Sequence, residues 1–139
     1  MDDKAKIGVV YTAYSKSNFF ARQMISAYVL QENKLPLNPF TNWDYFMADM
    51  VDRQLTVRAN NNLIYLANAV WQFGAVANGC YHELKLAMQL GQQIRFFSVG
   101  KTLQAIREIS VDEVEFEEEL QKMIKVKKFR AELKEYLQK

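Results

Sequence analysis

The sequence predicts an α/β domain with a mostly parallel sheet of four to five strands. Its 139 residues, half of them hydrophobic, are enough for one domain with a buried core. Short runs rich in β-branched and aromatic residues alternate with longer stretches of helical periodicity. Glycines directly follow two of those runs. Strands that alternate with helices in this way form βαβ units and therefore a parallel sheet.

The first strand is expected at residues 7–13 (IGVVYTA). Serine and asparagine residues follow it and suit a helix N-cap, so the spacing predicts a helix over residues 19–31. The next run, residues 35–40 (LPLNPF), contains two prolines. Because each proline removes a ladder donor, this segment is predicted to be an edge strand.

The middle of the chain completes the pattern. A helix is predicted over residues 41–66, interrupted near 58–62, where three consecutive asparagines are poor formers of a helix interior. Residues 69–73 (AVWQF) and 93–99 (QIRFFSV) are predicted strands, each followed by glycine. Between them, residues 78–91 (NGCYHELKLAMQLG) predict a short helix that ends at Gly91.

The last segment, residues 111–139, has acidic residues early and lysines late, an order that suits the helix dipole. We expect an α/β domain over residues 1–110. The extension over residues 111–139 is expected to be a charged, peripheral helix, continuous or broken, that packs on the domain or on a partner chain.

Composition narrows the functional classes. A net charge of +2 does not call for a nucleic-acid or membrane partner. The N-terminus lacks a secretion signal, and the single cysteine, Cys80, forms no internal disulfide. We expect a cytoplasmic protein without cofactor or metal, since one cysteine and one histidine do not make a zinc site.

Glu83 is the residue that the helical pattern leaves unexplained. On a helical wheel it falls on the apolar arc with Cys80, Leu84 and Ala87, one turn from the helix start. It should therefore point toward the carboxyl ends of the strands, where open α/β sheets bind ligands. Two interpretations remain open: a first-turn acid that favours the helix dipole, or a functional carboxylate that has a reason to accept desolvation.

Other residues near the expected ligand edge have two interpretations each. Gly79 either allows a ligand close to the backbone or forms a turn with Asn78. Arg58 either binds phosphate or is solvated. The aromatic residues after the second strand either stack on a base or cover the sheet edge; they are Trp43, Tyr45 and Phe46. His82 should lie on the polar face of its helix.

The order of several short segments resembles the nucleoside 2-deoxyribosyltransferase-like superfamily. These segments are "PLNPFTNWDYF", "RANNNLI", "AVWQFG", "NGxxxE" and "GQQIRFF". The superfamily includes nucleoside deoxyribosyltransferases and nucleotide N-glycosidases, and this chain looks like an uncharacterised branch. The resemblance covers about residues 7–100. It implies a flavodoxin-like three-layer sandwich that binds a nucleoside or nucleotide, and we expect a homo-oligomer.

The nucleophilic glutamate of that superfamily maps onto Glu83. In active members this carboxylate attacks the anomeric carbon of the sugar and expels the base, as in retaining glycosidases. The loop after the first strand contacts the ligand in that family, which implies a role for residues 11–17. With the candidates above, the expected ligand-binding residues are Tyr11, Tyr14, Ser15, Asn42, Asp44, Arg58, Asn61, Asn62, Asn78 and Gly79.

The chain departs from the family at the auxiliary acids. Asparagines occupy the usual acidic positions, namely residues 60–62, Asn68 and Asn78. An asparagine can hold a hydroxyl group but does not act as an acid or base near neutral pH. Asp44, Asp49 and Asp52 are candidate substitutes. The sequence therefore leaves two functions open: an N-glycosidase or deoxyribosyltransferase, and a non-catalytic nucleotide-binding or assembly module.

Overall fold

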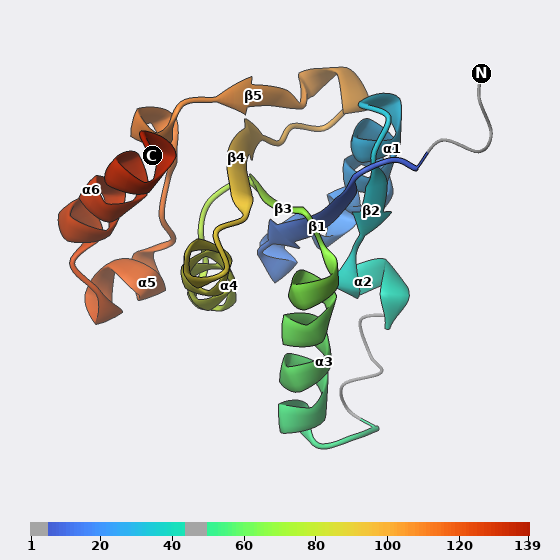
Figure 1. Ribbon diagram of the computed structural model, residues 1–139, viewed down its shortest axis with the longest axis horizontal. Helices are drawn as coiled ribbons and strands as arrows, with labels where there is room; N and C mark the ends of the chain where they lie inside the picture. Colours follow the sequence, from blue (N-terminus) through green and yellow to red (C-terminus); the bar gives the residue numbers. More distant parts are fainter. Residues whose placement is uncertain (1–5, 44–49) are drawn as a thin grey trace.

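The computed structural model describes residues 6–43 and 50–139, and its centre is a five-stranded sheet (Figure 1). The strands are β1 (Val9–Tyr14), β2 (Leu35–Leu37), β3 (Ala69–Phe73), β4 (Gln93–Ser98) and β5 (Arg107–Ile109), and they lie in the order β2-β1-β3-β4-β5. The first four strands are mutually parallel, and β5 runs antiparallel to β4. The predicted parallel α/β sheet is confirmed, with β2 at its edge.

The strand order places a topological switch point between β1 and β3. After β1 the chain moves outward to β2, and it then returns to the other side of β1 to form β3. This arrangement is the flavodoxin-like order, in which ligands bind beyond the carboxyl ends of the strands at the switch point. The loops after β1 and β3 therefore border the expected ligand crevice.

Helices cover both faces of the sheet. One face is covered by a 3₁₀ segment, η1 (Lys16–Ala21), and by α1 (Arg22–Gln31), whose Ile25 and Val29 are fully buried against Trp71 and Phe97. The other face is covered by α3 (Arg53–Leu66) and α4 (Asn78–Gln89), which place Ile64 and Leu84 in a second core cluster (Figure 1). The fold is thus a three-layer sandwich with a core on each face of the sheet.

Two boundaries differ from the sequence-based expectation. The three asparagines do not break a helix, because residues 60–62 lie inside α3, whose packing on α4 outweighs their low helix propensity. The second strand ends at Leu37, because Asn38 caps a short helix, α2 (Pro39–Asn42), with Pro39 at its first position. The antiparallel β5 had no predicted counterpart.

The extension forms several short elements that share the core of the sheet. It contains η4 (Val111–Glu113), α5 (Glu118–Met123) and α6 (Val126–Leu137). The capping-box sequence at Ser110 and Glu113 forms its paired hydrogen bonds. Leu120, Phe129 and Leu133 join the core cluster of α4. The Tyr136 hydroxyl donates to the Gln92 carbonyl, which ties α6 to the turn before β4.

Within residues 6–43 and 50–139, no helix is both long enough and apolar enough to cross a membrane.

Candidate active site

Two loops meet at the switch point between β1 and β3. The loop after β1 is ordered by Ser15, a buried N-cap whose Oγ accepts hydrogen bonds from the backbone N–H and the hydroxyl of Ser17. The loop after β3 begins at Gly74, which has a φ of +78°. A Cβ at this position would lie 2.4 Å from Nδ2 of Asn18 in the first loop. The glycine therefore allows the two loops to touch.

Glu83 lies just behind this edge, between α4 and the sheet. Its helix directly follows the loop after β3, and its carboxylate reaches β1. There the hydroxyl of Tyr11, a fully buried β1 residue, donates a hydrogen bond to Oε2 of Glu83. The Glu83 carboxylate is thus held against the sheet, on the apolar side of α4 where the helical wheel places it.

Burial changes the protonation of this pair. Desolvation raises the pKa of Glu83 from 4.5 to about 7, and the hydrogen bond from Tyr11 opposes that rise. Desolvation and the neighbouring carboxylate raise the pKa of Tyr11 well above its usual value, so the phenol stays a donor. The pKa of Glu83 thus lies near neutrality, which differs from that of a solvated acid at a helix start.

Cys80 lies one helical turn before Glu83, and Gln72 contacts Cys80. The pKa of the Cys80 thiol is raised to about 12, mainly by burial. The thiol is therefore neutral and unsuited to nucleophilic attack. Gln72 on β3 is fully buried. Its Nε2 donates to the Gly74 and Ala75 carbonyls, while Oε1 has no hydrogen-bond partner within the described residues. Within the described residues, Gln72 thus provides a buried acceptor without a partner near Cys80, and the Cys80 thiol is no competitor of Glu83 as a nucleophile.

The start of α4 is open at the same edge. Its N-cap, Ala77, makes no side-chain hydrogen bond to the first turn. Asn78 and Gly79 are both exposed, and a Cβ built at Gly79 would meet nothing within 4 Å. The first backbone N–H groups of a helix are unpaired donors with partial positive charge, so this end can accept hydroxyl or anionic groups of a ligand.

Three other candidate residues lie at or near the loop ends. Tyr14 is buried on the sheet face opposite Glu83, where its hydroxyl donates to Oδ1 of Asn38 over 2.6 Å. Ser15 uses its hydroxyl as the cap described above. Asn42 is exposed at the end of α2. The structure therefore does not bring these three side chains to the Glu83 carboxylate.

Several acids and aromatic residues named from the sequence fall on residues 44–49. Asp44, Tyr45, Phe46 and Asp49 lie outside the described residues. Asp52 is the N-cap of α3 and accepts a hydrogen bond from the Gln54 backbone over 2.9 Å, which gives it a structural role there.

The asparagines of α3 differ in what they contact. Asn60 accepts a hydrogen bond from the indole N–H of Trp43 over 2.7 Å, which fixes that ring between α2 and α3. Asn62 instead donates to the carbonyl of Arg58 in its own helix. Asn61 is half-buried, and Arg58 is exposed. His82 is exposed and packs edge-on against Tyr81.

Glu117, which no sequence pattern indicated, lies beside the loop after β1. Its Oε2 accepts a hydrogen bond from the Ser17 hydroxyl over 3.2 Å. The two residues are 100 positions apart, so periodicity and local motifs carry no signal for this contact.

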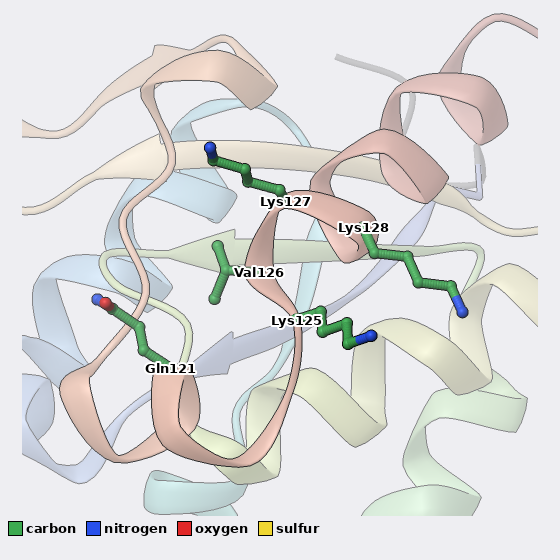
Figure 2. A pocket seen from close by; sticks show the side chains of 5 residues that line it. All are labelled: Gln121, Lys125, Val126, Lys127 and Lys128. Atoms are coloured by element: carbon green, nitrogen blue, oxygen red, sulfur yellow. The ribbon is translucent and has the colours of Figure 1, made fainter.

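Two surface hollows lie elsewhere on the molecule. One is lined by residues of the extension, namely Gln121, Lys125, Val126, Lys127 and Lys128, and Figure 2 shows that Lys127 and Lys128 extend in opposite directions. The other lies at the amino ends of β1 and β3, away from the switch point. Among the described residues, no group of three histidine, cysteine or acidic side chains could hold a metal ion.

Replacing Tyr11 by phenylalanine should raise the pKa of Glu83 further. The variant removes the hydrogen bond that favours the carboxylate, and desolvation then acts unopposed. NMR titration of a ¹³C-labelled glutamate side chain measures this shift directly. Trp71→Phe, on the opposite face of the sheet, is the control and should leave the Glu83 titration unchanged. An unchanged pKa in Tyr11→Phe would contradict the predicted role of the phenol.

Comparisons with known proteins agree with this architecture. Residues 7–97, most of the chain, match the model of a domain of unknown function, DUF7768. A solved structure of a 2-deoxyribosyltransferase from Bacillus psychrosaccharolyticus is similar with a TM-score of 0.54 and 14% sequence identity, over 79% of this chain and 86% of that one. At this identity the likeness shows the fold alone. No curated protein matches the sequence.

Proposed function

The chain belongs to the DUF7768 family and has the fold of a 2-deoxyribosyltransferase, and we propose on that basis that it cleaves or exchanges the N-glycosidic bond of a nucleoside or nucleotide. Glu83 is the proposed nucleophile. The observation that carries the proposal is the Tyr11–Glu83 pair, a partly buried carboxylate beside the switch point with its pKa raised to about 7.

The proposed reaction has two displacement steps. A carboxylate oxygen of Glu83 forms a bond to the anomeric carbon while the bond from that carbon to the base nitrogen breaks. The base leaves with the electron pair of the broken bond and takes up a proton from water. Water, or the nitrogen of a second base, then attacks the anomeric carbon and loses a proton to the solvent, and Glu83 leaves as the free carboxylate. Two easier displacements replace one difficult displacement, with oxocarbenium-like transition states.

Tyr11 is the proposed positioning residue of this reaction. Its hydroxyl holds one oxygen of Glu83 and leaves the other oxygen for the sugar carbon. Because the phenol favours the ionised form of Glu83, it also increases the fraction of nucleophile present near neutral pH. The exposed start of α4 and the Trp43 ring are the proposed contacts for sugar or phosphate groups and for the base.

A non-catalytic nucleotide-binding module is the second candidate. It is favoured by the asparagines at the auxiliary acidic positions, one of which, Asn60, accepts a hydrogen bond from the Trp43 indole. In such a module Glu83 would hydrogen-bond a ribose hydroxyl without attacking the sugar.

Base release separates the two functions. The purified protein is incubated with a panel of deoxynucleosides, nucleosides and their 5′-monophosphates, and free base is measured by chromatography. The enzyme hypothesis expects a rate that rises with pH as Glu83 ionises, with a midpoint near 7 in the free protein. Calorimetric binding of a panel member without any base release would support the binding module instead.

A further inference from the structure

We propose that Glu117 is a second carboxylate of the site, and that it makes the crevice select uncharged nucleosides over nucleoside monophosphates. This inference rests on the function proposed above, because it assumes that the crevice at the switch point takes a nucleoside.

The extension is fastened to the loop that leads into α4. Phe116 forms a parallel β-bridge with Val76, whose N–H donates to the Glu115 carbonyl over 2.9 Å. The N–H of Glu117 in turn donates to the Val76 carbonyl over 3.0 Å. Phe116 and Val76 are both buried, so the backbone of Glu117 is held against the loop after β3 by hydrogen bonds and by apolar packing.

The side chain of Glu117 then crosses the switch point. Its Oε2 accepts the hydrogen bond from Ser17, which belongs to the segment directly after β1. One residue thus joins the loops that follow β1 and β3, the two neighbouring strands between which the chain reverses its strand order. In an open α/β sheet this is the position where ligands bind.

The charge of Glu117, like that of Glu83, acts on the buried thiol of Cys80. Burial is the main cause of the raised pKa of the Cys80 thiol, and the charges of Glu83 and Glu117 both add to it. Within the part of the chain that the structure describes, no cation forms an ion pair with either carboxylate. The edge of the crevice therefore carries negative charge that no neighbouring ion pair offsets.

Negative charge at this edge favours the sugar hydroxyl groups of a ligand and disfavours a phosphate group. A carboxylate accepts hydrogen bonds from the hydroxyl groups of a sugar. Within the described residues, Glu117 accepts one side-chain hydrogen bond, from Ser17. A phosphate monoester is mostly a dianion at neutral pH and is repelled by a carboxylate. The open start of α4 attracts anions through partial charges only, whereas Glu117 carries a full negative charge that repels a phosphate.

The test compares binding of 2′-deoxynucleosides with binding of their 5′-monophosphates by calorimetry. The full chain carries Glu83→Gln in every sample, so that turnover does not disturb the measurement. With Glu117 present, the nucleoside should bind more tightly. Glu117→Gln should shift the ratio of the two dissociation constants at least about tenfold toward the monophosphate. Ser17→Ala, which releases the Glu117 side chain, should shift the ratio in the same direction by less.

Glu118→Gln is the matched control, because it removes the same charge from an exposed neighbouring residue. It should leave the ratio unchanged. An unchanged ratio in Glu117→Gln, an equal shift in Glu118→Gln, or no binding of either ligand would overturn the inference. A shifted ratio without base release by the protein that retains Glu83 would overturn the proposed catalysis and leave this inference standing. Base release together with an unchanged ratio would support the proposed catalysis and overturn this inference.

Discussion

Glu83→Gln is expected to abolish base release and, in the same molecule, to stabilise the fold at alkaline pH. Removal of a covalent nucleophile should lower the rate at least about 10³-fold. The amide is neutral, nearly the same size as the carboxylate, and still able to accept the hydrogen bond from Tyr11. The variant should therefore remain folded, so the loss of rate can be assigned to the missing nucleophile.

The gain in stability follows from the direction of the pKa shift. Burial raises the pKa of Glu83 from 4.5 to about 7, so between these values the folded state binds this proton more tightly than the unfolded state. The free energy of unfolding of the natural sequence should thus fall as the pH rises from about 4.5 to 7. Above pH 7 the penalty is fully present, at most roughly 3 kcal/mol. Glu83→Gln avoids this penalty.

Urea unfolding at pH 5, 7 and 8.5 measures this difference. The advantage of Glu83→Gln should be small at pH 5 and largest at pH 8.5. Glu119→Gln removes an exposed acid from α5 and should show no comparable gain with pH. Parallel pH profiles for the natural sequence and Glu83→Gln would contradict the assignment of a buried, partly protonated carboxyl group.

Deletion of residues 111–139 is expected to leave a chain that does not fold. The extension supplies Phe116, Leu120, Phe129 and Leu133 to the core that α4 shares with the sheet. Burial of each such side chain contributes about 1.5–3 kcal/mol, and the total stability of a domain is only about 5–15 kcal/mol. Without these side chains, apolar surface of α4 is exposed. Circular dichroism and size-exclusion chromatography should show an unfolded or aggregated product.

Two substitutions within α6 test the same packing without deletion. Leu133 is fully buried, whereas Leu137 is 41% exposed on the same helix. Leu133→Ala should lower the free energy of unfolding by about 2–5 kcal/mol, and Leu137→Ala should lower it by less than about 1 kcal/mol. A truncated chain that still unfolds cooperatively at a similar temperature, or equal effects of the two substitutions, would show that the extension is peripheral.

Local patterns predicted much of the fold because local physics determines it. The β-rich runs at β1, β3 and β4 and the glycine-terminated helix α4 are visible in short windows of sequence. The orientation of Glu83 also follows from helical periodicity alone. Such patterns failed at the asparagines inside α3, where packing outweighs low helix propensity. They also failed at β5, because a strand of three residues is too short to carry a pattern.

By itself, the sequence determined the parallel α/β class, the order of its main elements and the face of α4 on which Glu83 lies. Each of these follows from residue patterns that lie within short stretches of the chain. Only the tertiary structure decided that Tyr11 donates to Glu83, that Trp43 engages Asn60 and that Glu117 returns to the loop after β1. These contacts join residues 72, 17 and 100 positions apart. Such pairs form only when packing of the whole core brings distant segments together, so no local pattern specifies them.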